Sequence, residues 1–277
     1  QYLRTIFRLI LITKKNSPDW IISYDAYASI ITAISAYLNR IKWVYYQHDY
    51  WENPIGLWQK IIFKLEKKAV QSSEFWCFPQ HQRAKEFSKN SPKKKEVLII
   101  HNGPRLEWSK FQFQPHEIVC ELRQRFEFIV IYQGGWSFEF NFEKIFKAIP
   151  YIGHNICFLF IGKEHEIGVL DYYRNFCSKL KVQDRVIFYR DYIPYNELPS
   201  VTKYCDAGLS ILIDDGDTVP FNIKSLSGAS NKLAEYLCFG LPIIASDSKL
   251  NREYFEKNKI GFLLNTRDER KLADRIN

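Results

Sequence analysis

The chain has 277 residues, of which 46% are hydrophobic and 25% are charged, and its formal net charge is +8 at pH 7. A chain of this length can bury one large core or two cores of ordinary size, and we expect two domains. No apolar run reaches the roughly 20 residues that span a bilayer, and the start lacks the pattern of a signal peptide. We therefore expect a soluble protein.

The six cysteines are widely spaced, form no C-x-x-C pair and lie mostly within apolar segments. This pattern predicts reduced core cysteines in a cytoplasmic protein, not a disulfide frame or a zinc site. The chain contains no Met and begins at Gln1 inside an expected helix. We therefore expect a fragment that lacks the N-terminus of a longer protein.

The positive charge suits an anionic partner: a nucleotide sugar, an acidic membrane surface or nucleic acid. The 39 Lys and Arg residues are spread along the whole chain, and no recognisable nucleic-acid module occurs among them. Nucleic acid is therefore not an expected partner.

The first half alternates between short apolar runs and amphipathic stretches. A helix is predicted over 2–15, and strands over 19–23 and 42–47 flank a helix over 26–38. This succession predicts a right-handed parallel crossover. Further strands are predicted over 74–78 and 97–100, with a helix over 80–87 between them, and the mixed, polar residues 105–126 form a connection.

The strand over 42–47 ends at His48 and Asp49. Ligands of open α/β sheets bind beyond the carboxyl ends of the strands. His48 and Asp49 are therefore candidate site residues, and the alternative is a structural histidine at the end of a strand.

The stretch over 57–71 predicts a basic amphipathic helix, with Trp58, Ile61, Ile62 and Leu65 on its apolar side and lysines at 60, 64, 67 and 68. Two interpretations remain open. The apolar side packs on the sheet and the lysines are solvated, or the lysines contact anionic lipid from the cytoplasmic face of a membrane.

The second half repeats the alternation, with strands predicted over 128–132, 157–161, 186–188 and 207–213. Gly134 and Gly135 directly follow the first of these strands, where glycine lets a ligand approach the backbone closely. Asp215 and Asp217 have the spacing of a metal-binding Asp-x-Asp pair, but such acids are also common in solvated turns. We expect no metal site.

Residues 227–247 read SGASNKLAEYLCFGLPIIASD and predict a loop, a helix, a turn and a buried strand. The side chain of Asn231 can cap the helix, and Gly240 can end it. The first N–H groups of the helix can bind an anion such as a diphosphate. Lys232 adds a cation there, and Glu235 can accept hydrogen bonds from sugar or ribose hydroxyls. A surface lysine and a solvated glutamate are the alternative.

Residues 231–247 closely resemble the donor-site segment of the family 4 retaining glycosyltransferases, the group 1 glycosyl transferases. That segment has a Lys, a Glu-Tyr pair, a short apolar stretch, Gly-Leu-Pro and a β run, as at Lys232, Glu235, Tyr236 and 240–246 here. The resemblance implies the GT-B fold, an α/β protein of two Rossmann-like domains with parallel sheets facing across a cleft. It places a partial N-terminal, acceptor-side domain at 1–105 and a C-terminal nucleotide-sugar-binding domain at 106–277.

The resemblance also implies a reaction. A sugar would pass from a UDP- or GDP-sugar to a hydroxyl of a glycan or lipid-linked acceptor in cell-surface polysaccharide synthesis, with retention of configuration and without metal or other cofactor. The family has a His-Asp or His-Thr turn near the donor sugar, and a loop beside the base that matches the region of Arg190. The implied catalytic residues are His48, Glu235 and Asp49, and the implied donor-binding residues are Gly134, Gly135, Arg190, Ser227, Asn231, Lys232 and Leu233.

The sequence also departs from the family pattern. Many members carry two glutamates separated by seven residues; Glu235 matches the second of these, and this chain has Ser227 at the position of the first. Many members also carry an Arg and a Lys in the glycine loop, where this chain has Gly135 and Asn141. A catalytically silent GT-B domain that binds a nucleotide or a protein partner is therefore the alternative function.

Overall fold

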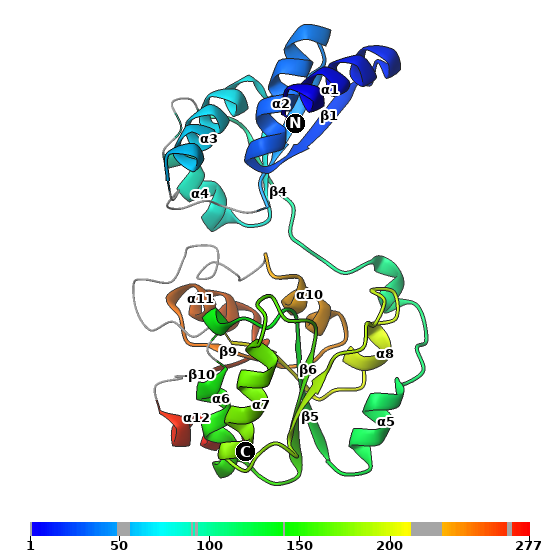
Figure 1. Ribbon diagram of the computed structural model, residues 1–277, viewed down its shortest axis with the longest axis vertical. Coiled ribbons are helices and arrows are strands. Elements are labelled where there is room, and N and C mark those ends of the chain that lie inside the picture. The colour runs from blue at the N-terminus through cyan, green and yellow to red at the C-terminus, as the bar shows by residue number, and fades with distance from the viewer. Residues whose placement is uncertain are drawn as a thin grey trace. The chain divides into compact units, whose positions relative to one another are not determined.

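A computed structural model describes residues 2–48, 56–89, 91, 94–140, 142–211, 229–264 and 268–277 of the chain. The chain forms two compact units (Figure 1). Unit 1 comprises residues 1–102 and 220–229, and unit 2 comprises 103–219 and 230–277. No helix among the described residues is both long and apolar enough to cross a membrane.

Unit 1 is built on a four-stranded parallel sheet with the order β1-β2-β3-β4. Its aromatic core includes Trp43, Tyr45, Trp76, Phe78 and Phe87. In chain order its elements are α1 (Tyr2–Asn16), β1 (Trp20–Tyr24), α2 (Asp25–Asn39), β2 (Lys42–Tyr46), α3 (Gly56–Ala69), η1 (Val70–Ser72), β3 (Trp76–Phe78), α4 (His81–Lys89) and β4 (Val97–Ile99).

Unit 2 is built on a six-stranded parallel sheet with the order β10-β9-β8-β5-β6-β7. In chain order its elements are η2 (Leu106–Ser109), α5 (Glu117–Arg123), β5 (Phe128–Gln133), η3 (Phe138–Phe140), α6 (Glu143–Ala148), η4 (Ile149–Tyr151), β6 (Ile156–Ile161), α7 (Val169–Lys179), β7 (Val186–Tyr189), α8 (Pro199–Thr202), β8 (Ala207–Ser210), α10 (Asn231–Cys238), β9 (Ile243–Ser246), α11 (Lys249–Asn258), β10 (Gly261–Leu264) and α12 (Glu269–Ile276).

Both faces of the second sheet are buried, as a parallel sheet requires. Along β5, Val130 and Tyr132 belong to one core cluster, whereas Ile129 and Ile131 belong to the other. The chain runs from β5 to β6 and β7 on one side and continues through β8, β9 and β10 on the other. The strand order therefore reverses between β5 and β8, which is where ligands bind in doubly wound sheets.

The predicted fold class, α/β with two parallel sheets, is confirmed. The connection predicted over 105–126 contains two elements that were missed, the 3-10 helix η2 and the helix α5. The side chain of His116 accepts the N–H of Ile118 at 3.3 Å, so a histidine starts this helix in place of the usual Ser, Thr, Asp or Asn.

The interpretation that the apolar side of α3 packs on the sheet holds only for Ile62, which is buried. The other three residues of that side, Trp58, Ile61 and Leu65, are exposed, and Glu66 is buried beside Ile62. The helix therefore turns most of its apolar side away from the core of unit 1 and buries an acid.

Candidate active site

Helix α10 starts beside the point where the strand order reverses. Its first helical residue is Asn231, and Ser230 occupies the N-cap position without a side-chain capping bond, so the predicted Asn231 cap is wrong by one residue. The N–H of Ala234 bonds the carbonyl of Ser230 at 3.4 Å. By helix geometry the three preceding N–H groups have no acceptor within the helix, so they are free to bind an anion.

The side chain of Leu233 is 4% exposed and belongs to the core of unit 2. Leu233 was predicted to bind the donor, and with its side chain buried only its backbone N–H can bind a ligand. Further along the helix, the core position of Tyr236 fixes α10 to the sheet. The Tyr236 hydroxyl accepts the N–H of Gln133 at 3.0 Å and lies 3.2 Å from the carbonyl of Ile131.

The loop after β5 is packed so tightly that glycine is required. Gly134 has φ +150°, and a Cβ added there would lie 3.2 Å from Nζ of Lys232. A Cβ on Gly162 would lie 1.9 Å from the carbonyl oxygen of Gly134, and one on Gly135 would lie 1.8 Å from Nε2 of His165. Gly134 therefore brings the backbone of this loop beside Lys232 at the start of α10, and Gly135 packs against His165.

Lys232 is half-buried and reaches back over the glycine loop. Its Nζ lies 3.2 Å from the hydroxyl of Tyr132 and 4.3 Å from the centre of the Tyr132 ring. That hydroxyl donates to the carbonyl of Gly135 at 3.0 Å. Burial lowers the pKa of Lys232 to about 8, and the nearby Glu235 carboxylate partly opposes this. A cation held in this way gains stability when an anion such as a diphosphate binds beside it.

Glu235 lies one turn after Lys232 and is 6% exposed. Burial raises its pKa, while hydrogen bonds from Gln133 and Tyr195 and the charge of Lys232 lower it. The side-chain amide of Gln133 donates to the carboxylate. The hydroxyl of Thr202 lies 2.8 Å from the other end of that amide, Oε1, and therefore orients it. The predicted pair of Lys232 and Glu235 is thus part of a larger polar group.

Tyr195 covers one side of this group. It is 41% exposed, and its ring lies 4.8 Å from that of Trp108. Trp108 is buried and stacks on Phe239, with 6.0 Å between ring centres. The guanidinium of Arg105 lies 5.9 Å from the Tyr195 ring. An aromatic wall therefore stands beside Glu235.

Sequence reasoning missed Gln133, Tyr132, Tyr195 and Thr202. Gln133 and Tyr132 could have been predicted from the sequence. They end a buried strand just before a glycine pair, and polar groups at that end of a strand face the site. Tyr195 and Thr202 lie about 40 and 30 residues before Glu235, and only the fold brings them to it.

Arg190 follows β7 and is exposed. Its guanidinium lies 3.8 Å from Glu164, and Glu164 also accepts the N–H groups of Gly168 and Leu170 at 3.2 and 3.3 Å, at the start of α7. Arg190 is thus placed beside the loop after β6, not within the group around Glu235. Its predicted place beside a nucleotide base stays a prediction.

His48 lies in unit 1, just past the carboxyl end of β2. Its N–H donates to Asp25 at 2.7 Å, and its carbonyl accepts from the guanidinium of Arg83. The imidazole stacks on Tyr46, with ring centres 4.6 Å apart, and makes a tilted contact with Tyr24, with ring centres 5.3 Å apart. The backbone and the ring of His48 are therefore both held in place.

Several residues that the sequence analysis singled out lie outside the described residues: Asp49, Asn141, Asp215, Asp217 and Ser227. Within the described part of the chain, no group of three or more His, Cys, Asp or Glu residues could hold a metal ion.

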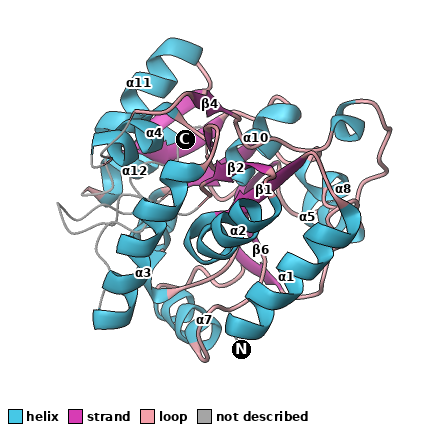
Figure 2. Cartoon of the chain, turned by 90° about the horizontal axis from the view of Figure 1, so that it is seen from above, coloured by secondary structure: helices cyan, strands magenta, loops and turns pink. Residues whose placement is uncertain are grey.

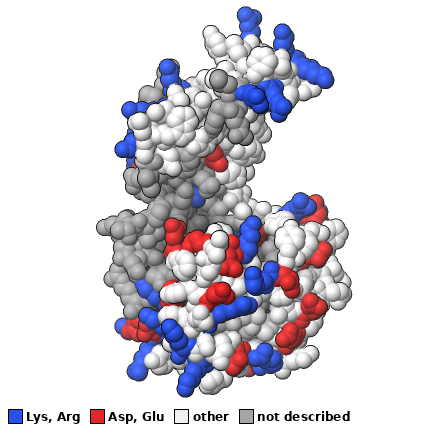
Figure 3. All heavy atoms as spheres, in the orientation of Figure 1, with Lys and Arg blue, Asp and Glu red and all other residues white. Residues whose placement is uncertain are grey.

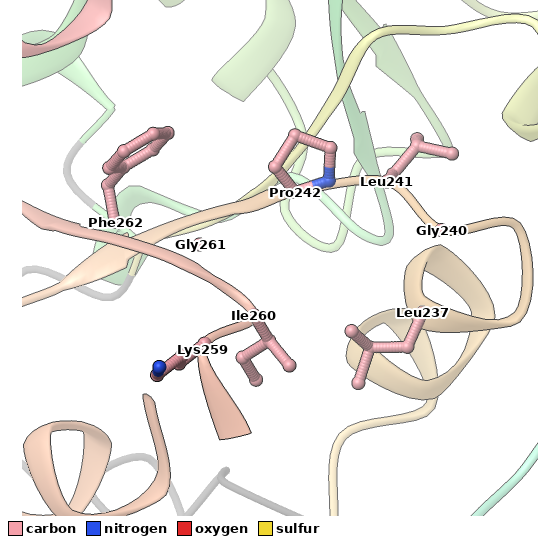
Figure 4. A pocket seen from close by; sticks show the side chains of 8 residues that line it. All are labelled: Leu237, Gly240, Leu241, Pro242, Lys259, Ile260, Gly261 and Phe262. Atoms are coloured by element: carbon pink, nitrogen blue, oxygen red, sulfur yellow. The ribbon is translucent and has the colours of Figure 1, made fainter. Parts of the chain in front are cut away.

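A cavity of about 430 Å³ lies at the opposite end of α10. It is lined by Leu237, Gly240, Leu241, Pro242, Lys259, Ile260, Gly261 and Phe262 (Figure 4). Because these residues surround the carboxyl end of α10 and the amino ends of β9 and β10, the cavity is distinct from the Lys232 and Glu235 group.

A family model described as glycosyl transferases group 1 matches residues 121–277. The chain belongs to this family. The match covers the whole glycine loop, Lys232 and Glu235, so the polar group described above is that of a group 1 glycosyl transferase. No match was found among curated protein sequences.

Solved structures share the fold of this group 1 glycosyl transferase. Alr3699/HepE from Anabaena in complex with UDP is similar over 98% of this chain and 71% of its own, with a TM-score of 0.72 and 16% identity. A glycosyltransferase from Rickettsia africae ESF-5 is similar over 99% and 70%, with a TM-score of 0.73 and 13% identity. The lipopolysaccharide outer core galactosyltransferase WaaB, in its apo form, is similar over 100% and 70%, with a TM-score of 0.59 and 13% identity.

Proposed function

We propose that the chain transfers a hexose from a nucleoside diphosphate sugar to a hydroxyl of a glycan or lipid-linked acceptor in cell-surface polysaccharide synthesis. The observation that carries this proposal is the placement of Lys232 and Glu235 one turn apart on α10, with the glycine loop against Lys232. In the reaction the bond from the anomeric carbon to the diphosphate breaks and a bond to the acceptor oxygen forms. The acceptor proton and the nucleoside diphosphate are released.

The diphosphate gains negative charge as it leaves, so groups that stabilise that charge lower the barrier. The N–H groups at the start of α10 and the ammonium of Lys232 supply this stabilisation without a metal ion. Because Gly134 and Gly135 have no side chains, the diphosphate can approach the backbone of their loop closely.

Glu235 accepts hydrogen bonds from hydroxyls of the donor. Gln133 and Thr202 hold its carboxylate in one orientation, and a fixed acceptor costs less to organise when the donor binds. His48 positions the donor sugar or the acceptor, with Asp49 beside it in sequence, and retention of configuration is proposed on the resemblance to the family.

The proposed donor is a UDP-sugar. Alr3699/HepE has been crystallised with UDP and also with UDP-glucose. The UDP-glucose complex is similar to this chain with a TM-score of 0.71. The similar fold supports UDP as the first nucleotide to test, and a GDP-sugar is the alternative.

The test is release of UDP from UDP-glucose and UDP-galactose, with water as the acceptor of the sugar, followed by ³¹P NMR for the native chain and for Glu235→Ala. We expect the variant to lose release while its melting temperature stays within a few degrees of the native value. Lys179→Gln, on the exposed surface of α7, is the matched control and should keep native rates. Full activity in Glu235→Ala would contradict the proposal, and nucleotide binding without release by the native chain would favour the silent domain.

A further inference from the structure

Helix α3 exposes an apolar stripe that the core of unit 1 does not use. Leu57, Ile61 and Leu65 follow one another at a spacing of four residues, and their exposed fractions are 77%, 39% and 44%. Trp58 lies beside them and is 59% exposed. Residues four apart in a helix lie on one face, so the four side chains form one continuous apolar surface, which we name the α3 stripe.

The buried side of α3 carries one apolar residue, Ile62, and one acid. Glu66 is 4% exposed and its carboxylate accepts a hydrogen bond from the hydroxyl of Tyr45 in the core of the sheet. Burying a carboxyl group is unfavourable, and so is leaving several large apolar side chains in water. The packing of unit 1 alone therefore does not account for this arrangement, whereas an apolar partner outside unit 1 does.

A row of lysines runs along the stripe. Lys60, Lys64 and Lys68 are all exposed and also follow at a spacing of four, and Lys67 lies 4.2 Å from the centre of the Phe63 ring. Like charges one turn apart weaken an isolated helix. Glu66 is the only acid in α3, and it is buried. The exposed charge of α3 is therefore entirely positive and is complementary to an anionic partner.

In Figure 2, α2 lies between α1 and α3, and α3 contacts α2 on that side. Lys and Arg side chains gather over α1 and α3 in Figure 3. Helix α1 adds Phe7, Leu11 and Ile12, exposed by 65%, 51% and 56%, and contains Arg4, Arg8, Lys14 and Lys15 but no acid.

We propose that α3 docks on an anionic lipid surface, with the α3 stripe in the boundary between headgroups and acyl chains and Lys60, Lys64 and Lys68 on the headgroups. A helix with apolar and aromatic residues on one side and lysines on the other lies in the plane of such an interface. A second copy of the chain fits less well. A two-fold contact through the stripe would bring two rows of lysines together, which is unfavourable.

The test is flotation of the 277-residue chain with vesicles of phosphatidylcholine alone and of phosphatidylcholine with about 30% phosphatidylglycerol. We expect binding to the anionic vesicles only, and a loss of binding in high salt. Since each lysine near an anionic surface contributes on the order of 1 kcal/mol, the triple change Lys60→Gln, Lys64→Gln and Lys68→Gln should weaken partitioning by roughly tenfold or more. Trp58→Ser with Leu65→Ser should have a similar effect.

Two controls separate lipid binding from folding and from net charge. Changing Lys179, Lys203 and Lys257, which are exposed on unit 2, to Gln lowers the charge equally and should leave partitioning near the native value. Every variant should keep the native melting temperature. Absence of binding to anionic vesicles, an equal loss in the unit 2 control, or a dimer in light scattering that the stripe variant abolishes would each overturn the proposal.

Discussion

The side-chain amide of Gln133 donates a hydrogen bond to the carboxylate of Glu235, although the two residues are 102 positions apart. Gln133 is the last residue of β5, and Glu235 lies in α10 on the other side of the strand reversal. Thr202 holds the far end of the same amide. The two halves of the sheet of unit 2 thus meet in one buried polar contact, and Glu235 cannot turn away without taking the acceptor from Nε2 of Gln133.

Changing Gln133 to Leu is expected to lower kcat/KM for release of UDP from a UDP-sugar by about 10- to 100-fold. A hydrogen bond to a charged group contributes roughly 1.5–3 kcal/mol, and the change also removes the group that keeps the raised pKa of Glu235 from rising further. The pH profile should therefore shift to higher pH on its acid side. Gln124→Leu, at an exposed position, is the control, and an unshifted profile in the Gln133 variant would argue against this role.

The affinity for UDP is expected to fall as the pH rises through about 8. The pKa of Lys232 is about 8 in the absence of a ligand, and a bound diphosphate favours the charged form, so binding near pH 8 to 9 should take up a proton. Calorimetry in buffers of different ionisation enthalpy measures that uptake. In Lys232→Gln both the uptake and the fall in affinity above pH 8 should disappear, and their persistence would assign the titration to another group.

The stability of unit 1 is expected to decrease as the pH rises from about 4.5 to about 7. Burial raises the pKa of Glu66 from 4.5 to about 7, so the folded state binds more protons than the unfolded state in this range, and unfolding becomes easier as they dissociate. The full effect is roughly 3 kcal/mol.

Glu66→Gln should therefore stabilise the chain at pH 8, by about 1–3 kcal/mol in denaturant unfolding, and change little at pH 4.5. Glu121→Gln, at an exposed position, is the matched control. A gain of the same size at both pH values would show that the benefit of Glu66→Gln does not come from titration.

Gly135 and His165 are expected to be energetically coupled. A Cβ on Gly135 would meet the imidazole at 1.8 Å, so Gly135→Ala should destabilise unit 2 by about 1–3 kcal/mol. The second change His165→Ala should restore at least about 1 kcal/mol of this loss. Gly103→Ala, where a Cβ meets nothing within 4 Å, is the control and should be nearly neutral. Additive effects of the Gly135 and His165 changes on the free energy of unfolding would show that these two residues do not pack closely together.

The sequence predicted the elements well where the hydrophobic pattern is strong. The strands around Val130 and Phe158 are long apolar runs, and both were placed within one residue of their bounds. Lys232 and Glu235 were predicted as site residues because both lie on one short helix with a recognisable spacing. Contacts that depend on the order of strands, such as those of Gln133 and Tyr195, carry no local pattern and could not be predicted.

The orientation of α3 shows a different limit. Helical periodicity shows that Trp58, Ile61 and Leu65 share a face, but not whether that face meets the core. In the structure these three residues face away from the core, and Glu66 on the buried side accepts a hydrogen bond from Tyr45. Tyr45 lies in β2, so no pattern within the helix itself could have revealed this contact.

Thermal unfolding with nucleotides tests the central assignment most directly. The native chain, Lys232→Gln and Glu235→Gln would each be melted with UDP, GDP, ADP and a short single-stranded RNA, because specific binding raises the melting temperature by mass action. We expect UDP to raise the melting temperature of the native chain by several degrees, the Lys232 variant to lose most of that increase, and RNA to have no effect. An increase with RNA alone, or an equal increase with UDP in the native chain and in Lys232→Gln, would contradict the placement of the diphosphate at the start of α10.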